Sequence, residues 1–276
     1  MTYRILDRAA GLLIAGLVMA CMTPAAKAQS APFIIELSQP DQPMTLNLGM
    51  LSANIVVIGE RRNDIQLEVA GGNSGRRIIT PSGSQEIGGA SYRLSATEDN
   101  NIVEVSSDWR MSTLDITARI PASAAVTLWT TNNGTIVVEN VTGEMQLRNT
   151  NGPITVKGAA AAVIAESVNE DIAVSFADLG SVTASSLSSV NGDLAVGLPG
   201  QPKVQVQIDT ARGEISSDFE IEVQASEPTV SRSEEGGTIE IAVESMIIAN
   251  INGGGPVIRM KTLNGDIQIN KADMTR

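Results

Sequence analysis

Histidine is absent from this 276-residue sequence, and cysteine occurs once, at Cys21. The lack of histidine removes the commonest general base and metal ligand from the chain. A single cysteine can form neither an internal disulfide nor a cysteine cluster for a metal. We therefore predict no catalytic residues, no metal site and no cofactor, and we expect a protein that is not an enzyme.

Aromatic residues are also scarce, at 3% of the sequence. Large globular cores usually use more of them, because each ring buries a large apolar area. A thin core of Val, Ile, Leu and Ala between stacked strands does not need them. No segment shows the 3.6-residue period of an amphipathic helix, whereas many short segments alternate apolar and polar residues. The composition favours an elongated all-β fold over a compact α/β domain.

Basic residues are in the minority. The chain has 19 Lys and Arg against 31 Asp and Glu, a formal net charge of −12. Nucleic acids and anionic membrane surfaces bind proteins that present a basic footprint, so we exclude both as primary partners. An acidic surface is compatible with solubility and with cation-bridged contacts to an anionic glycan.

The N-terminus has the three parts of an export signal. Arg4 and Arg8 precede the apolar run 11–22, and Ala26-Lys27-Ala28 follows it. The run of about 12 residues is too short to span a bilayer, which takes roughly 20. This pattern predicts a signal peptide over residues 1–28. We expect an exported protein without a membrane span, in the periplasm, at the cell surface or outside the cell.

The same segment has a second interpretation. Val18-Met19-Ala20-Cys21 resembles the lipobox, at which bacterial lipoproteins are cleaved and lipidated on the cysteine. Met19 departs from the small or β-branched residue usual at that position, so we favour a mature protein that begins at Gln29. Mass spectrometry of the mature N-terminus separates the two interpretations.

Six segments share one template: Asn-Gly or a close variant, one spacer, then apolar-x-apolar. They begin at Asn133, Asn151, Asn169, Asn191, Arg212 and Asn264, with steps of 18, 18, 22 and 21 before a longer gap. A repeat near 20 residues with turn residues in phase is typical of stacked β-repeats. The predicted corner residues are Asn133, Gly134, Asn151, Gly152, Asn169, Asn191, Gly192, Gly213, Asn264 and Gly265.

The Asn-Gly pairs fit the tight corners of such a stack. Glycine adopts positive φ at little cost, and asparagine tolerates it better than most residues. Stacked strands lie about 4.8 Å apart, so asparagines at one corner can form a hydrogen-bonded ladder. We expect this ladder along the stack.

Two folds compete for this pattern. Asn-Gly between alternating segments is also a hairpin signal, which would give an antiparallel meander. However, each 18-residue period holds two strands, and Asn-Gly marks only one of the two turns. The apolar offsets also repeat in phase, so that Ile154 and Ile172 would contact each other. We therefore predict a parallel β-solenoid of two-strand repeats of about 18–22 residues.

We divide the chain after the signal peptide into two regions. Residues 29–128 form an N-terminal β region that continues or caps the solenoid, and residues 129–276 form the repeats. The second strand of each repeat is expected at Val163-x-Ala165, Val182-x-Ala184 and Val204-x-Val206. Residues 220–237 are predicted to be an excursion loop or hairpin, after which the pattern returns at Ile239-x-Ile241-x-Val243.

The residues of the repeat region resemble a known family. The motif consists of Leu114-Asp-Ile-Thr-Ala-Arg-Ile-Pro121, the segment Trp129–Val138, and Asn-Gly-Asp-Ile/Leu at 191–194 and 264–267. It is similar to a bacterial domain-of-unknown-function family of β-strand-repeat proteins known as putative adhesins. This resemblance implies an exported β-solenoid and no catalytic residues. Asn169-Glu170 and Arg212-Gly213 depart from the family's Asn-Gly motif.

Three groups of residues are candidates for a site. Asp171, Asp193, Glu214 and Asp266 would line one edge and could hold Ca²⁺, but Asp is a common turn residue and Thr135 and Pro153 interrupt the row. The pairs Arg61-Arg62 and Arg76-Arg77 could contact an anionic glycan, although solvated loops are the simpler interpretation. Trp109 and Trp129 could stack on a sugar ring, but a single Trp in a strand is more often part of the core.

The sequence therefore predicts an exported, non-catalytic binding or scaffold module, an adhesin-like protein of the cell envelope. Its partner would be an envelope glycan or protein. A periplasmic accessory protein in envelope stress or assembly is the first alternative, and a polysaccharide-active β-helix enzyme is the second.

Overall fold

The computed structural model describes residues 32–70, 77–79, 85–87, 94–107, 113–224, 229–235, 238–244 and 246–272. The predicted signal peptide with Cys21, and also Arg76 and Trp109, lie outside these residues.

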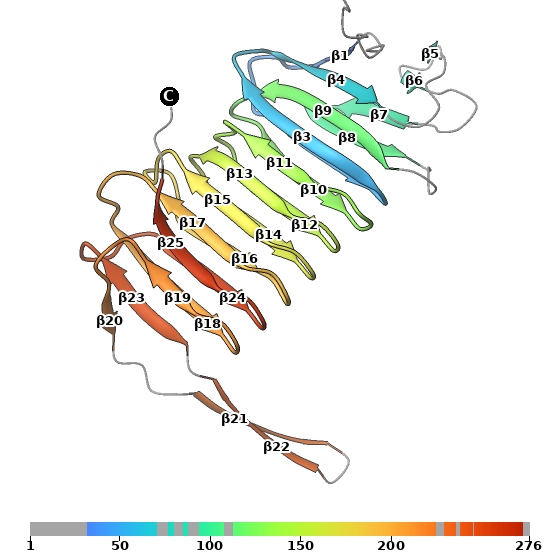
Figure 1. Ribbon diagram of the computed structural model, residues 1–276. Helices are drawn as coiled ribbons and strands as arrows, with labels where there is room; N and C mark the ends of the chain where they lie inside the picture. The colour runs from blue at the N-terminus through green and yellow to red at the C-terminus, as the bar shows by residue number, and fades with distance from the viewer. Residues whose placement is uncertain are drawn as a thin grey trace, which may run out of the picture.

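The described part of the chain consists of strands and connecting turns, without helices, which confirms the all-β prediction. Most strands belong to two large sheets that face each other (Figure 1). Sheet A has the order β1 (Phe33–Glu36), β4 (Asp64–Ala70), β9 (Leu114–Pro121), β3 (Ala53–Glu60), β11 (Ile136–Glu139), β13 (Ile154–Ala159), β15 (Ile172–Phe176), β17 (Leu194–Leu198), β25 (Ile267–Lys271), β19 (Ile215–Ser217). Sheet B has the order β20 (Glu222–Gln224), β23 (Ile247–Ile251), β18 (Val204–Thr210), β24 (Val257–Thr262), β16 (Ala184–Ser188), β14 (Val163–Ser167), β12 (Met145–Asn149), β10 (Ala125–Thr130), β2 (Thr45–Met50), β8 (Ile102–Ser107), β7 (Leu94–Asp99), β6 (Gln85–Ile87), β5 (Arg77–Ile79).

The chain alternates between the sheets. We call a strand of sheet B and the strand of sheet A that follows it a rung. Neighbouring rungs pair in parallel within both sheets, as β10 does with β12 and β11 with β13. The registers place like residues on like residues: Ile136 pairs with Ile154, and Ile154 pairs with Ile172, as the repeat predicts. Parallel pairing excludes the antiparallel meander for these strands.

The spatial order of the rungs differs from their order in the sequence at both ends of the stack. The rung β2–β3 lies between β8–β9 and β10–β11. At the other end, the last rung in sequence, β24–β25, lies between β16–β17 and β18–β19. Both ends thus contain a rung inserted from a distant part of the chain.

Antiparallel strands cover the ends of the stack. At the N-terminal end, β4 and β1 extend sheet A beyond β9, and β7, β6 and β5 extend sheet B beyond β8. At the C-terminal end, β23 and β20 extend sheet B beyond β18, while β19 forms the edge of sheet A.

The core fills the space between the two sheets. Each rung strand alternates buried and more exposed residues, and the buried ones are almost all aliphatic. Phe176 is the largest fully buried side chain among the described residues. Because branched aliphatic residues stack well on their own kind in adjacent strands, a column of Ile and a column of Val run through β3, β11, β13 and β15 of sheet A.

One predicted strand register is wrong. The sequence pattern aligns Val182-x-Ala184 with Val163-x-Ala165, but Ser185 and Leu187 point into the core while Ala184 is exposed. The reason is a turn at 178–180, where Asp178 Oδ1 accepts the N–H groups of Leu179 and Gly180. This turn takes up the extra residues of the 22-residue repeat and shifts the phase of the following strand.

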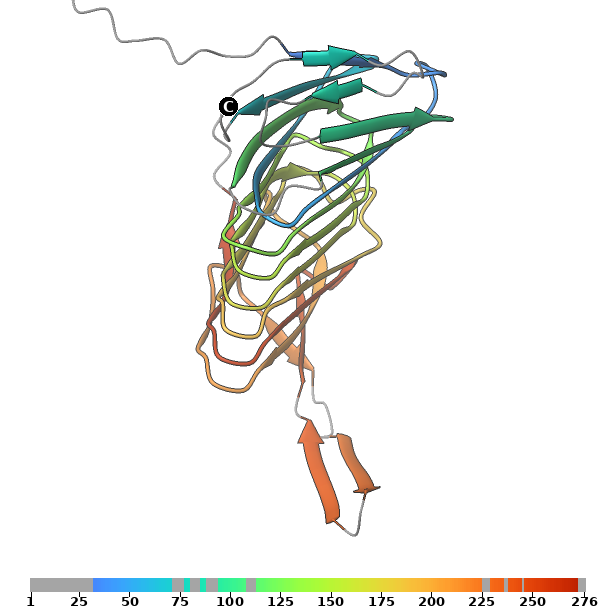
Figure 2. The ribbon, with the colours of Figure 1, turned by 90° about the vertical axis from the view of Figure 1, so that its right-hand side faces the viewer.

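The expected return of the repeat at Ile239-x-Ile241-x-Val243 is also wrong. These residues lie in β22 (Thr238–Glu244), which pairs with β21 (Thr229–Glu235) in a separate two-stranded antiparallel sheet. Figure 2 shows this hairpin projecting away from the two large sheets. The period-2 alternation of a hairpin strand is the same as that of a rung strand, so the local pattern could not separate the two.

Candidate functional site

The predicted asparagine ladder is present at one corner of the stack. Asn169 Nδ2 donates to Asn151 Oδ1 at 2.6 Å, Asn191 donates to Asn169 at 2.9 Å, and Asn264 donates to Asn191 at 2.8 Å. Asn151 donates to the carbonyl oxygen of Thr131 at 2.9 Å. The ladder crosses the insertion of β24–β25, because Asn264 follows Asn191 in space.

Asn133 does not take the ladder position in its rung. Extending the register of Thr130 with Asn149 places Asn132, not Asn133, beside Asn151. Asn133 is an extra residue with φ of 45°, a conformation that asparagine tolerates. The insertion explains why the ladder ends at Asn151.

The corner glycines serve close packing rather than positive φ. None of Gly134, Gly152, Gly192, Gly213 and Gly265 has positive φ. A Cβ on Gly152 would overlap the carbonyl oxygen of Gly134, and one on Gly265 would overlap that of Gly192. The predicted reason for these glycines is therefore wrong: they allow the backbone of one rung to lie against the next.

At three corners a buried or half-buried polar side chain bonds to the carbonyl oxygen of the corner glycine of the neighbouring rung. Asn149 Nδ2 donates to Gly134 O at 2.8 Å, Thr262 Oγ1 donates to Gly192 O at 2.9 Å, and Thr210 Oγ1 donates to Gly265 O at 3.1 Å. These side chains satisfy the carbonyl groups that exclude a Cβ. The sequence signal is a polar residue three positions before each glycine in these repeats, which the Asn-Gly template did not include.

The acidic row is a hydrogen-bonded column. The carboxylate of Asp171 accepts the N–H of Asp193, that of Asp193 accepts the N–H of Asp266, and that of Asp266 accepts the N–H of Glu214, each at 2.8 Å. These bonds assign Asp171, Asp193 and Asp266 a structural role in the corner. Within the described residues, no three His, Cys, Asp or Glu side chains come together in a group that could hold a metal ion.

Of the predicted basic pairs, Arg61-Arg62 lies in the described part of the chain. Arg62 Nε is 2.8 Å from Asp64 Oδ1, and the side chain of Arg62 is only 14% exposed. Arg62 is therefore held by its own neighbours, whereas Arg61 is exposed. Arg77 lies in β5, and its side chain is outside the described part of the structure.

The strongest candidate for a contact site is the outer face of sheet B around Trp129. Trp129 is 43% exposed, because Val126 and Leu128 take the inward positions of β10. Its register partner in β2 is Gly49, and a Cβ on Gly49 would overlap the indole ring. The indole therefore lies over the backbone of the neighbouring strand and leaves its outer side to solvent.

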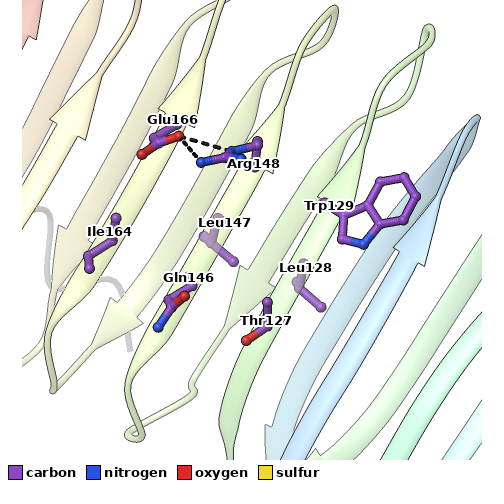
Figure 3. A pocket seen from close by; sticks show the side chains of 8 residues that line it. All are labelled: Thr127, Leu128, Trp129, Gln146, Leu147, Arg148, Ile164 and Glu166. Atoms are coloured by element: carbon purple, nitrogen blue, oxygen red, sulfur yellow. Dashed lines mark hydrogen bonds and ion pairs between the residues drawn. The ribbon is translucent and has the colours of Figure 1, made fainter.

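Two shallow hollows lie on either side of Trp129 and share Trp129 and Thr127. The first, of about 250 Å³, extends over β12 and β14 to Gln146, Arg148 and Glu166. Figure 3 shows Trp129 turned away from Arg148 and Glu166, which point toward each other. The second hollow, of about 200 Å³, extends over β2 and β8 to Asn47 and Glu104. Together the hollows form a continuous strip across five strands, which we call the Trp129 strip.

The strip has mixed polar chemistry. Arg148 Nε donates to Glu166 Oε2 at 2.9 Å, and both side chains are largely exposed, at 70% and 46%. Such an exposed pair contributes about 0–1 kcal/mol, so a ligand can rearrange it at little cost. The amides of Asn47 and Gln146 and the hydroxyl of Thr127 provide donors and acceptors.

The chain is similar in structure to a solved protein. It is a putative cell adhesion protein from Clostridium sporogenes, with 12% sequence identity and a TM-score of 0.45 over 87% of this chain and 100% of that chain. No family model and no curated protein matches the sequence. The described residues include no apolar helix of the length that a membrane crossing needs.

Proposed function

We propose that this chain is an exported, non-catalytic β-solenoid that binds a partner of the cell envelope through the Trp129 strip. The solenoid assignment is supported by the parallel registers of both sheets and by the corner ladder. Export is supported by the pattern of residues 1–28. The observation on which the binding role rests is the exposed Trp129 between two hollows.

A rigid stack suits binding better than catalysis. The acids of the corner row accept backbone N–H groups, and Arg148 is paired with Glu166 on an open surface. General acid–base and nucleophilic catalysis need groups whose environment tunes their reactivity, which burial or strong coupling provides. An exposed tryptophan on a flat sheet provides contact area instead.

The proposal is tested by binding of the purified mature protein to envelope fragments of the source cells. We expect sedimentation with the fragments to fall at least tenfold for Trp129→Ala, while the variant still unfolds cooperatively because Trp129 lies outside the core between the sheets. Val190→Ala is the matched control, since Val190 is a similarly exposed apolar residue, at 39%, on the ladder corner. Equal binding of Trp129→Ala and the wild type would remove the strip as the contact surface.

A further inference from the structure

We propose that the ligand of the Trp129 strip is a linear oligosaccharide, with one sugar ring stacked on Trp129 and the adjoining rings in the two hollows. This inference rests on the proposed function and names the chemistry of the partner.

The first support is the way in which Trp129 is held. Because Gly49 has no side chain, the indole lies flat over the β2 backbone, with one side covered and the other open. The backbone beneath the ring restricts the rotamers open to the indole before binding, so less side-chain entropy is lost when a ligand stacks on it. A flat, rigid aromatic surface beside hydrogen-bonding groups suits a sugar ring, which has an apolar face of C–H groups and a rim of hydroxyls.

The second support is the lining of the hollows. Glu104 on one side and Glu166 on the other accept hydrogen bonds from hydroxyl groups, while Arg148 donates to them. Asn47 and Gln146 do both. Each hollow is smaller than the roughly 300–1,000 Å³ of a typical pocket for a compact small molecule. A ligand that fills both must therefore be extended and must pass over Trp129.

The strip is less suited to other polymers. Protein interfaces have an apolar core, but Trp129 and Ile164 are the only large exposed hydrophobic residues among those lining the hollows. Nucleic acids also stack on aromatic rings, but they need a basic groove, and this chain has a net charge of −12. A glycan is the polymer that matches both the single stacking ring and the mixed polar lining.

The test uses tryptophan fluorescence and calorimetry on the full mature chain with cellotetraose, chitotetraose and N-acetylglucosamine as probes. A Trp109→Phe background makes Trp129 the only tryptophan reporter. We expect at least one tetrasaccharide to bind and to perturb the fluorescence of Trp129, and N-acetylglucosamine to bind at least tenfold more weakly because it cannot fill both hollows.

Two variants separate stacking from other causes. In calorimetry, Trp129→Ala should weaken tetrasaccharide binding about tenfold, the effect of losing one stacked ring. Gly49→Ala should weaken it similarly while keeping the tryptophan, because the new methyl group displaces the indole. Val190→Ala, on the ladder corner, should bind like the wild type.

The possible outcomes distinguish this inference from the proposed function. In one outcome, no saccharide probe binds at concentrations up to about 10 mM, yet envelope binding depends on Trp129 and is abolished when the fragments are treated with protease. The partner is then a protein, and the oligosaccharide inference is overturned. If saccharide binding is found but is unchanged in Trp129→Ala and Gly49→Ala, the inference is overturned as well. If the fragments do not bind the wild type, the proposed function itself fails.

Discussion

The two ends of the stack differ in how their edge strands are covered. Each contains a rung inserted from a distant part of the sequence, β2–β3 at one end and β24–β25 at the other. Among the described residues, antiparallel strands cover the N-terminal end in both sheets and the C-terminal end only in sheet B. In sheet A the C-terminal edge is β19, which has only three residues.

This difference shows that a repeat stack can be ended by covering its edges or by shortening them. An uncovered strand offers unpaired N–H and C=O groups to other chains, and a very short strand offers few of them. The inserted rungs add a second effect. Each inserted rung pairs on both sides with rungs from other parts of the sequence. An end of the chain therefore cannot detach from the stack without breaking the pairing on both sides of its rung.

The largest expected effect comes from removing the C-terminal inserted rung. Deletion of residues 257–276 takes away β24 and β25, whose Ile258, Met260, Ile267 and Ile269 are fully buried. Burial of one such side chain contributes about 1.5–3 kcal/mol, so the loss should exceed about 5 kcal/mol. We expect β18 and β19 to lose protection in hydrogen exchange, while β2–β3 and β10–β11 keep theirs.

The hairpin β21–β22 provides the control for this deletion. It pairs only with itself, so replacing residues 229–244 by a short Gly-Ser linker should leave the melting temperature within about 2 °C of the wild type, as expected for a change of a few tenths of a kcal/mol. A large loss of stability in this variant, or none in the 257–276 deletion, would contradict the role assigned to the inserted rung.

A glycine substitution should test the packing of both inserted rungs. Gly265→Ala places a Cβ on the carbonyl oxygen of Gly192, and Gly134→Ala places one on that of Ala53. Backbone atoms cannot move aside as a side chain does, so we expect each to cost about 3 kcal/mol in chemical denaturation. Gly180→Ala is the control, because the atom nearest to its new Cβ is a side-chain atom, Asp178 Oδ2, at 3.3 Å, and not backbone. Equal stability of all three variants would remove the close-packing explanation.

Replacing an asparagine inside the ladder should cost more stability than replacing the asparagine at its end. Asn191→Ala breaks two ladder bonds, to Asn169 and from Asn264, whereas Asn264→Ala breaks one. With about 1 kcal/mol for each bond, urea unfolding should show the loss for Asn191 to be about twice that for Asn264. Arg212→Ala, at the exposed corner of the last rung, should be neutral. If Asn191→Ala were equally neutral, the ladder would make no contribution to stability.

The smallest expected effect is at the N-terminal end and depends on pH. The hydroxyl of Ser38 donates to the Glu98 carboxylate at 2.7 Å, and the N–H groups of Ser38 and Asn101 also donate to it. The bond from the Ser38 side chain, followed by the two backbone bonds, lowers the pKa of Glu98 below its ordinary value of 4.5 although desolvation opposes them. A lowered pKa means that the ionised carboxylate stabilises the fold above pH 4.5 and that this contribution is lost as the pH falls through the lowered pKa.

Glu98→Gln isolates this contribution. The melting temperature of the variant should lie slightly below that of the wild type at neutral pH, and the difference should vanish under acidic conditions. A difference that stays constant down to pH 3 would show that the Ser38 contact does not depend on ionisation of Glu98.

Much of the candidate site could be predicted from local patterns, but its key contact could not. Val126 and Leu128 set the inward phase of their strand, which places Trp129 outward, a signal that the expectation of a core tryptophan overlooked. The contact of Trp129 with Gly49 depends on the insertion of β2 beside β10, between residues 80 positions apart. No local period contains that information.

The sequence by itself determined the all-β fold, the parallel stacking of the repeats and the asparagine ladder, because period-2 alternation and corner residues are local properties that recur in phase. The tertiary structure alone decided the order of the rungs and the reason for the corner glycines. All rungs present similar edges and similar aliphatic columns, so local sequence does not specify which rung is the neighbour of which. That choice depends on long-range packing at the two ends, where β2–β3 and β24–β25 fit between rungs that the sequence places elsewhere.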